Sequence, residues 1–258
     1  MPLFDEWCEN DPQTDKKKKL WKLTEKADGR DGIKAQLAVI VRSHYDSLER
    51  IAADVETLGY NAAAAILSER LPRGKKARSG DIGEILASEL TEEMLGFNVP
   101  IRRMRFKDGR DVALRGDDFI GVAYDSEDKL WLLKGESKSR AVLAKSTITD
   151  ARRTLNRDNG RCTPLSLLFI ADRLLDRGGD DEELGKTIRA EVALKSLPAS
   201  RIDHTLFTLS GNAPPQALTD DFNALGQERL QSVVNLRIED HADFIAEVYE
   251  EAGDLGDE

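Results

Sequence analysis

Two short apolar runs organise this sequence: Asp118-Phe-Ile-Gly-Val-Ala-Tyr124 and Leu130-Trp-Leu-Leu-Lys-Gly-Glu-Ser-Lys138. Between them lies a polar break, Asp125-Ser-Glu-Asp-Lys129. Two apolar runs joined by a polar segment of this length predict a β-hairpin. If these five residues form the loop, Tyr124 pairs with Leu130. The same register then runs back to the open end of the hairpin.

At that open end the register places Asp118 directly opposite Glu136. Side chains alternate along a strand, so Lys138 shares the face of Glu136 and Ser137 points away. Two carboxylates and an ammonium are costly in a buried sheet unless a cation and a reaction use them. Carboxylates at this spacing suit a hard divalent cation, with the Ser137 carbonyl as a further oxygen ligand. The alternative interpretation is a purely structural cluster of ion pairs between the two strands, at the end of a sheet.

A divalent cation at this position would polarise a phosphodiester and lower the pKa of a bound water. Lys138 would then orient or deprotonate that water. Asp117 is the alternative to Asp118, since a slip of one residue in the register would exchange their faces.

The order of Asp118 and Glu136-Ser137-Lys138 resembles the PD-(D/E)XK nuclease pattern, an aspartate on one strand and Glu-x-Lys on the next. The expected flanking elements also follow that fold, over about residues 78–172. They are a helix at 80–95, a strand at 97–106, the hairpin, a helix at 147–157 and a strand at 165–171. The resemblance implies an α/β fold with a mixed central sheet flanked by helices.

Two further segments, Gly80-Asp-Ile-Gly-Glu84 and Leu236-Arg-Ile-Glu-Asp-His-Ala-Asp-Phe244, resemble the HamA family. HamA is the nuclease-like effector of the bacterial Hachiman anti-phage system. This resemblance implies a larger complex in which a helicase partner, HamB, restrains cutting. In many relatives of the nuclease fold a glutamate near this helix start reaches the metal, and Glu84 is the matching position. Glu89 is the fallback.

The 258 residues are enough for one large domain, or for a domain with a helical extension. We expect an N-terminal helical extension at 1–72 and the nuclease-like domain at 73–258. With 40% hydrophobic and 33% charged residues, the composition is that of a soluble protein. Apolar runs fall far short of a membrane span, and the two cysteines are single and far apart. A cytoplasmic protein without a membrane partner is expected.

The formal charge of −10 is unevenly distributed. Residues 1–72 hold 11 basic and 13 acidic side chains, residues 73–162 hold 19 and 15, and residues 163–258 hold 8 and 20. Only the segment with the candidate site is net positive, which fits local contact with phosphate. The acidic remainder would limit nonspecific binding or face a basic partner.

Apolar residues at helical spacing predict helices within residues 32–70, followed by a basic linker at 71–80. Lys16–Lys19 is interpreted as a flexible arm or a solvated charge run. The expected strand at 97–107 carries Arg102, Arg103, Arg105 and Lys107 and would line a DNA groove or form a charged edge. Phosphate contacts are expected from a set of basic residues after the hairpin: Arg140, Lys145, Arg152, Arg153 and Arg157.

Helices are also expected at 180–197, 221–225 and 240–252, and strands at 204–209 and 233–238. The three histidines have no ligand spacing and are interpreted as structural or exposed.

Together these features predict a DNA endonuclease that depends on Mg²⁺ or Mn²⁺. Asp118 and Glu136 would hold the metal, Lys138 would assist the water, and Glu84 would complete the shell. The alternatives are a non-catalytic nucleic-acid-binding or scaffold subunit of the same fold, and an enzyme that cuts RNA or branched DNA.

Overall fold

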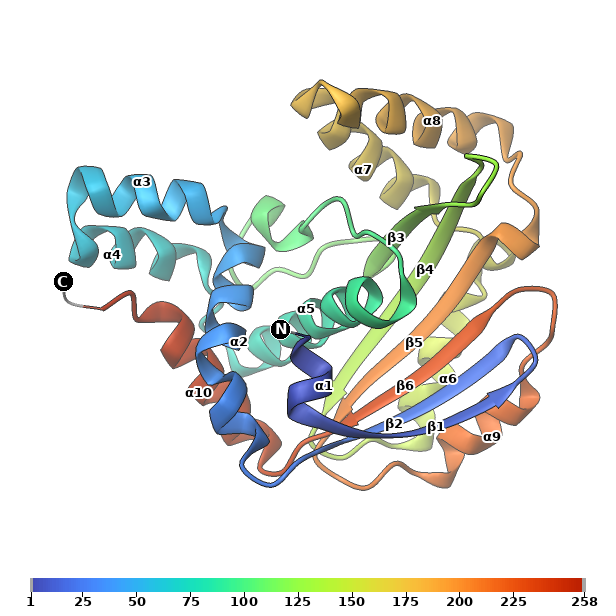
Figure 1. Ribbon diagram of the computed structural model, residues 1–258, viewed down its shortest axis with the longest axis horizontal. Helices are drawn as coiled ribbons and strands as arrows, with labels where there is room; N and C mark the ends of the chain where they lie inside the picture. Colours follow the sequence, from blue (N-terminus) through green and yellow to red (C-terminus); the bar gives the residue numbers. More distant parts are fainter. Residues whose placement is uncertain (1, 257–258) are drawn as a thin grey trace.

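A computed structural model describes residues 2–256, which form a six-stranded mixed sheet with helices on both faces (Figure 1). The strand order is β1-β2-β6-β5-β4-β3. The four central strands are parallel, and β1 and β3 are antiparallel edge strands. The strands are β1 (Cys8–Asp15), β2 (Lys18–Glu25), β3 (Phe119–Tyr124), β4 (Leu130–Arg140), β5 (Ile202–Ser210) and β6 (Gln231–Arg237). The predicted α/β class with a mixed sheet flanked by helices is confirmed.

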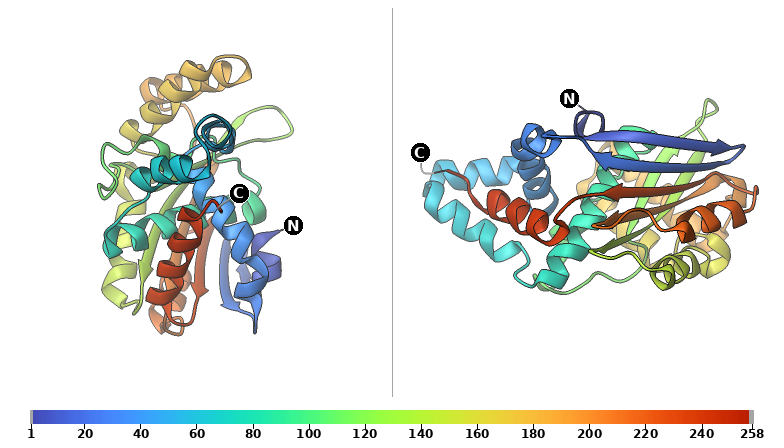
Figure 2. Two further views of the ribbon diagram at one scale, coloured as in Figure 1. Left: turned by 90° about the vertical axis from the view of Figure 1, so that its left-hand side faces the viewer. Right: turned by 90° about the horizontal axis from the view of Figure 1, so that it is seen from below.

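Ten α-helices lie within the described residues. They are α1 (Leu3–Trp7), α2 (Gly29–Tyr45), α3 (Leu48–Leu58), α4 (Tyr60–Arg70), α5 (Lys75–Leu95), α6 (Lys145–Leu155), α7 (Pro164–Arg177), α8 (Asp180–Leu194), α9 (Gln216–Ala224) and α10 (His241–Gly253). Helices α1, α2, α5 and α10 pack over one face of the sheet, and α6, α7 and α9 cover the other. The α3–α4 pair projects away from the sheet (Figures 1 and 2). No helix in residues 2–256 is long and apolar enough to cross a membrane.

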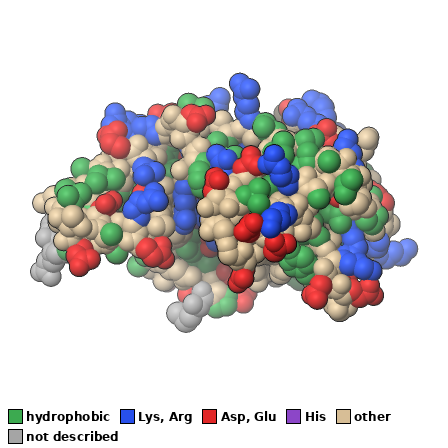
Figure 3. Space-filling model, turned by 90° about the horizontal axis from the view of Figure 1, so that it is seen from above, with side chains coloured by type: hydrophobic (Ala, Val, Ile, Leu, Met, Phe, Trp, Pro, Cys, Tyr) green, Lys and Arg blue, Asp and Glu red, His purple; other side chains and the backbone are tan. Residues whose placement is uncertain are grey.

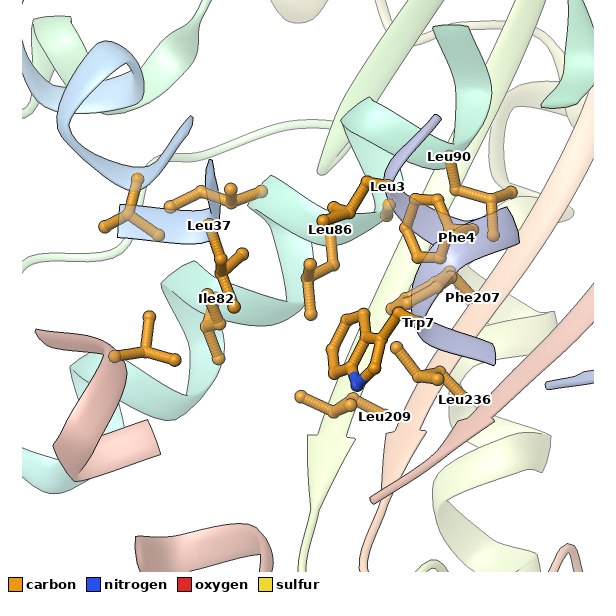
Figure 4. Close-up of a cluster of buried hydrophobic side chains, with 14 of the residues drawn as sticks. Leu3, Phe4, Trp7, Leu37, Ile82, Leu86, Leu90, Phe207, Leu209 and Leu236 are labelled. Carbon is orange, nitrogen blue, oxygen red and sulfur yellow. The ribbon is translucent and has the colours of Figure 1, made fainter. Parts of the chain in front are cut away.

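The largest core lies between α5 and the sheet (Figure 4). One face of α5 is apolar and packs into this core, where Ile82, Ile85, Leu86 and Leu90 are fully buried. Trp7 closes the far side of this core and is also fully buried. Burial of these side chains fixes which face of α5 meets the strands, and so fixes where its polar residues point.

Residues 8–25 form the hairpin β1–β2, which joins the sheet because β2 pairs with β6. The interpretation of Lys16–Lys19 as a flexible arm is therefore wrong, and that of a solvated run holds only for Lys16 and Lys17, which are exposed at the turn. Lys18 is buried, and its ammonium lies 2.9 Å from Asp15. Leu20 is buried on one face of β2 and Leu23 on the other, because the sheet is covered by helices on both sides, and this burial supplies the reason for the strand. The division into domains at residue 72 stays a prediction, although this hairpin ties the first segment to the sheet.

The expected strand at 97–107 is wrong. A single bridge pairs Asn98 with Val122, and a short 3₁₀ turn follows at Arg103–Phe106. Pro100 lacks an N–H, so it cannot continue a ladder beyond that bridge.

The four basic residues of this segment bind within the protein and do not line an open groove. Arg102 pairs with Glu89 at 3.2 Å, Arg105 donates to the Ser43 carbonyl at 2.9 Å, and Lys107 pairs with Asp81 at 2.6 Å. Arg103 is buried beside the candidate site, as described below.

The expected strand at 165–171 is also wrong, because this segment lies inside α7. Thr163 caps the helix by accepting the N–H of Ser166, and Pro164 occupies the first turn. The buried residues of α7 recur at helical spacing: Leu167, Ile170, Ala171 and Leu174. Both the cap and the spacing are visible in the sequence, and they outweigh the strand-like run of apolar residues.

The basic linker expected at 71–80 is helical from Lys75, where α5 begins, and the other expected elements are present with shifts of their ends. The helices expected at 147–157, 180–197, 221–225 and 240–252 correspond to α6, α8, α9 and α10. The strands expected at 204–209 and 233–238 correspond to β5 and β6.

Candidate active site

Strands β3 and β4 pair in the predicted register, with Tyr124 opposite Leu130. Asp118 lies immediately before β3. Its Oδ2 accepts the main-chain N–H of Ser137 on β4 at 2.8 Å. This bond holds the carboxylate of Asp118 against β4, beside that of Glu136.

The Lys138 ammonium lies among three oxygens from both strands. It donates to Oε1 of Glu136 and to the Ser137 carbonyl at 3.0 Å. It also lies 3.8 Å from Oδ2 of Asp118. These oxygens belong to the three groups that the sequence predicts as metal ligands. The Lys138 ammonium therefore occupies the position at which the sequence predicts a cation.

Electrostatics at this cluster are unbalanced toward negative charge. Burial raises the pKa of Glu136 to about 7, and the nearby Asp118 carboxylate adds to the rise. Burial likewise raises the pKa of Asp118, against the opposing effect of Lys138. Burial alone would lower the pKa of Lys138, but Asp118 and Glu136 outweigh it and the net pKa is raised. One ammonium therefore does not fully compensate the two carboxylates, and further positive charge would stabilise them.

Helix α5 brings Glu84 to the same place from the other side of Asp118. Glu84, Arg103 and Asp118 line a cavity of about 10 Å³. Oε2 of Glu84 is buried, lacks a hydrogen-bond partner among residues 2–256, and lies 3.7 Å from Nη1 of Arg103. Burial, followed by the charge of Asp118, raises the pKa of Glu84 well above its usual value. An unpartnered buried carboxylate oxygen is costly in a protein interior.

The two alternative ligands have structural partners instead. Glu89 lies 2.8 Å from Nε2 of His44. The fully buried Asp117 accepts the N–H of Thr163 at 2.7 Å and lies 3.6 Å from the Lys134 ammonium. The geometry therefore groups Asp118 with Glu84, and places the two alternatives in other networks.

Arg103 is a positioning residue that sequence reasoning missed. Its guanidinium donates to the main-chain carbonyls of Asp117, of Asp118 at 2.7 Å and of Arg115 at 2.8 Å. These bonds hold the segment that leads into β3 and so fix the Asp118 carboxylate. No local pattern indicates this role, because the partners are carbonyl groups more than ten residues away.

No group of three or more histidine, cysteine, aspartate or glutamate side chains within residues 2–256 could hold a metal by itself. The donor set consists instead of the carboxylates of Asp118 and Glu136 and the carbonyl of Ser137, and all three face one ammonium. Hard divalent cations prefer such oxygen donors. With the unpartnered oxygen of Glu84 nearby, the residues fit a divalent cation that displaces Lys138 from its present contacts.

The basic residues expected to contact phosphate, which begin at Arg140 at the end of β4, fall into two groups. Arg152 and Arg153 pair with Asp221 and Asp150, at 2.8 Å and 3.0 Å. The second group comprises Arg140, Lys145 and Arg157. Within residues 2–256, these three side chains form no ion pair with a carboxylate. This second group keeps its charge available for an anion.

Comparison with known proteins places the chain in a family. The chain matches a family model described as HamA over residues 1–252. A curated relative, the Hachiman protein HamA of Bacillus cereus, is 32% identical over 117 residues. That alignment covers 45% of this chain and 40% of the relative, so the chain matches about two fifths of the relative's length. The family match takes in both strands of the hairpin, α5 and the segment that carries Arg103. Because it spans nearly the full chain, this protein belongs to the HamA family.

Proposed function

We propose that this protein is a metal-dependent DNA endonuclease and the effector of a Hachiman-type anti-phage defence complex. The observation that carries the proposal is the convergence of Asp118, Glu136 and the Ser137 carbonyl on the Lys138 ammonium. The raised pKa of both carboxylates supports it, since burial without enough positive charge is destabilising. Membership of the HamA family supports the defence role.

In this proposal Asp118, Glu136 and the Ser137 carbonyl hold a Mg²⁺ or Mn²⁺ ion, and Glu84 supplies a further oxygen. The bound ion would supply Lewis-acid chemistry to a phosphodiester and its attacking water. Lys138 has a raised pKa and is an ammonium in this geometry, so it orients the water and stabilises developing negative charge. Arg103 keeps Asp118 in place while these groups act.

DNA is proposed as the substrate because the site lies in the net-positive segment of an otherwise acidic chain. Arg140 at the end of β4 and Lys145 at the start of α6 form no ion pair within residues 2–256, and they would hold phosphate without reading sequence.

A helicase subunit resembling HamB is the proposed partner. The surface proposed for it comprises the helices at 32–70 and the acidic C-terminal third. The α3–α4 pair projects from the sheet (Figure 1) and exposes four large apolar side chains: Leu48, Leu58, Tyr60 and Ile66. Apolar side chains grouped on a projecting helical pair are typical of a protein interface.

The decisive experiment is a cleavage assay with purified protein on plasmid, linear and single-stranded DNA. We expect cleavage with Mg²⁺, none in EDTA, and binding without turnover in Ca²⁺. Lys138→Ala is expected to lower the rate by about 10²–10⁴-fold. It should also lower the thermal midpoint, because it leaves the buried carboxylates of Asp118 and Glu136 without their ammonium. Lys129→Ala, on the exposed loop of the same hairpin, is the matched control and should cut normally.

Three results would contradict the proposal. Cleavage unchanged in EDTA would exclude the metal mechanism. A Lys138→Ala protein that unfolds readily, but whose folded fraction cuts at the normal rate, would establish a purely structural ion cluster. Cleavage of RNA with DNA left intact would move the proposal to the RNA alternative.

A further inference from the structure

A second cavity, of about 400 Å³, lies at the end of β4 between the first turns of α5 and α10. Its basic lining residues are Lys75, Lys76, Arg78 and Arg140. Asp243 is the one acidic residue among those that line it. The cavity is therefore strongly positive in a chain whose formal charge is −10.

The four basic side chains are free of carboxylate partners. Within residues 2–256, none of them forms an ion pair, although acidic residues outnumber basic ones in the chain. Arg78 is held by the Pro72 carbonyl at 2.8 Å and by the ring of Tyr249. Lys75, Lys76 and Arg140 are exposed at the rim. Unpaired charges of one sign around a cavity raise the local concentration of an oppositely charged ligand.

The cavity floor is ordered by a chain of hydrogen bonds that joins three elements. Ser139 Oγ lies 2.9 Å from Ser79 Oγ on α5 and 2.9 Å from His241 Nε2 on α10. Ser139 and His241 are buried. The first turns of both helices face the cavity, and helix N-termini favour anions. The floor is thus rigid and adds to the attraction of the basic rim.

The cavity adjoins the candidate active site through β4. Arg140 at the cavity rim is two residues after Lys138, or about 6.6 Å along the strand. Ser139 points to the opposite face from Lys138, so the cavity lies around the end of β4 from the carboxylates. A nucleic-acid strand bound at the candidate active site would pass within reach of this rim.

We propose that this cavity binds one nucleoside phosphate of the nucleic-acid strand, adjacent to the phosphate held at Asp118 and Glu136. The basic rim holds the phosphate, and the small apolar side chains of Ala242, Ile245 and Ala246 contact the sugar or base. The volume lies in the range of small-molecule sites. This inference rests on the proposed function, because it assigns the position of that strand.

The test is the binding of fluorescein-labelled oligonucleotides, single-stranded and duplex, measured by fluorescence anisotropy in EDTA over a salt series. Lys75→Gln/Lys76→Gln should weaken binding several-fold and reduce the slope of log K against log salt by about one to two. Ala246→Trp, which fills the cavity, should also weaken binding. The matched controls are Lys16→Gln/Lys17→Gln, an exposed pair at the other end of the sheet, and Ala53→Trp on exposed α3. Both should bind as the wild type does, and thermal midpoints should be alike.

Equal affinity and salt slope in the cavity variants and the wild type would overturn the inference, as would an equal loss in the controls. Free dAMP distinguishes the source of the ligand. Competition by dAMP that Ala246→Trp abolishes supports a nucleotide site. Binding of dAMP with no effect of the cavity variants on oligonucleotides would overturn the assignment to the strand. These binding measurements are made in EDTA. Their outcome therefore does not depend on whether the protein cleaves DNA with metal, and a failure of this inference can be told apart from a failure of the proposed cleavage.

Discussion

At the scale of single residues, two neighbouring aspartates have opposite environments. Asp117 is fully buried and satisfied by the N–H of Thr163 and the nearby Lys134. Asp118 shares a single ammonium with Glu136 and adjoins the unpartnered oxygen of Glu84. A satisfied buried charge is typical of a structural role, whereas a cluster short of compensating charge is typical of a functional site.

Asp203 offers a test of how burial governs stability away from the candidate site. It is buried on β5, and its carboxylate accepts the indole N–H of Trp131 at 3.1 Å. Burial raises the pKa of Asp203 to about 6. The Asp203 carboxyl therefore ionises at lower pH in the unfolded chain than in the folded protein. As a result, the folded protein loses stability as pH rises from about 4 to 6.

We expect Asp203→Asn to remove this loss while keeping a side-chain oxygen for Trp131. The free energy of unfolding of Asp203→Asn relative to the wild type should rise by on the order of 2 kcal/mol between pH 4.5 and pH 8. Urea titrations at both pH values measure it. A gain of the same size at both pH values would show that the pKa of Asp203 is not raised in the folded protein.

At the scale of elements, α5 organises the candidate site. Its apolar stripe packs on the sheet, Glu84 faces Asp118, and Ser79 reaches Ser139 at the second cavity. This close approach depends on Gly83. A Cβ there would lie 2.8 Å from Ser137 Oγ and 3.2 Å from Ser139 Cβ. A side chain at this position would push α5 away from β4.

Gly83→Ala should therefore destabilise the protein, and Gly80→Ala on the same helix is its matched control. A Cβ at Gly80 meets nothing within 4 Å, so alanine there should stabilise by about 0.5–1 kcal/mol through helix propensity. Overpacking at Gly83 should cost about 1–3 kcal/mol. Thermal unfolding of both variants compares them directly. Equal midpoints would show that β4 yields without cost to the new side chain.

At the scale of the whole molecule, charge and shape separate the candidate site from the proposed partner surface. The face in Figure 3 shows basic and acidic side chains interspersed, with apolar side chains between them. The net positive segment is confined to residues 73–162, and the last third is strongly acidic. This division of charge along the chain suits the proposed contact with DNA at one end of the sheet and the proposed protein partner elsewhere.

If restraint comes from the proposed helicase partner, the wild-type chain expressed alone should harm its host. Glu136→Ala should be tolerated, because it removes a proposed metal ligand. Co-expression with the helicase should relieve the harm and give a complex that co-purifies. Growth curves and pull-down measure both. A lone chain that is harmless in cells yet cuts DNA in the tube would show that restraint is intrinsic.

The sequence by itself determined what depends on local pattern and loop length. Five polar residues between two apolar runs set the register of β3 and β4, which brings Asp118 to Glu136 and Lys138. The presence of α5, α6, α8 and α10 was also readable, because periodic burial selects one face of each helix. These features involve neighbours in sequence or a single tight connection.

Only the tertiary structure decided the contacts between distant segments. It buried Arg103 against the carbonyls before β3, chose Glu84 over Glu89 as the neighbour of Asp118, and closed the second cavity with α10. It also paired β2 with β6 across more than two hundred residues. A polar side chain gives no local sign of which remote donor or acceptor will satisfy it. That partner is set by how the whole chain buries its apolar surface.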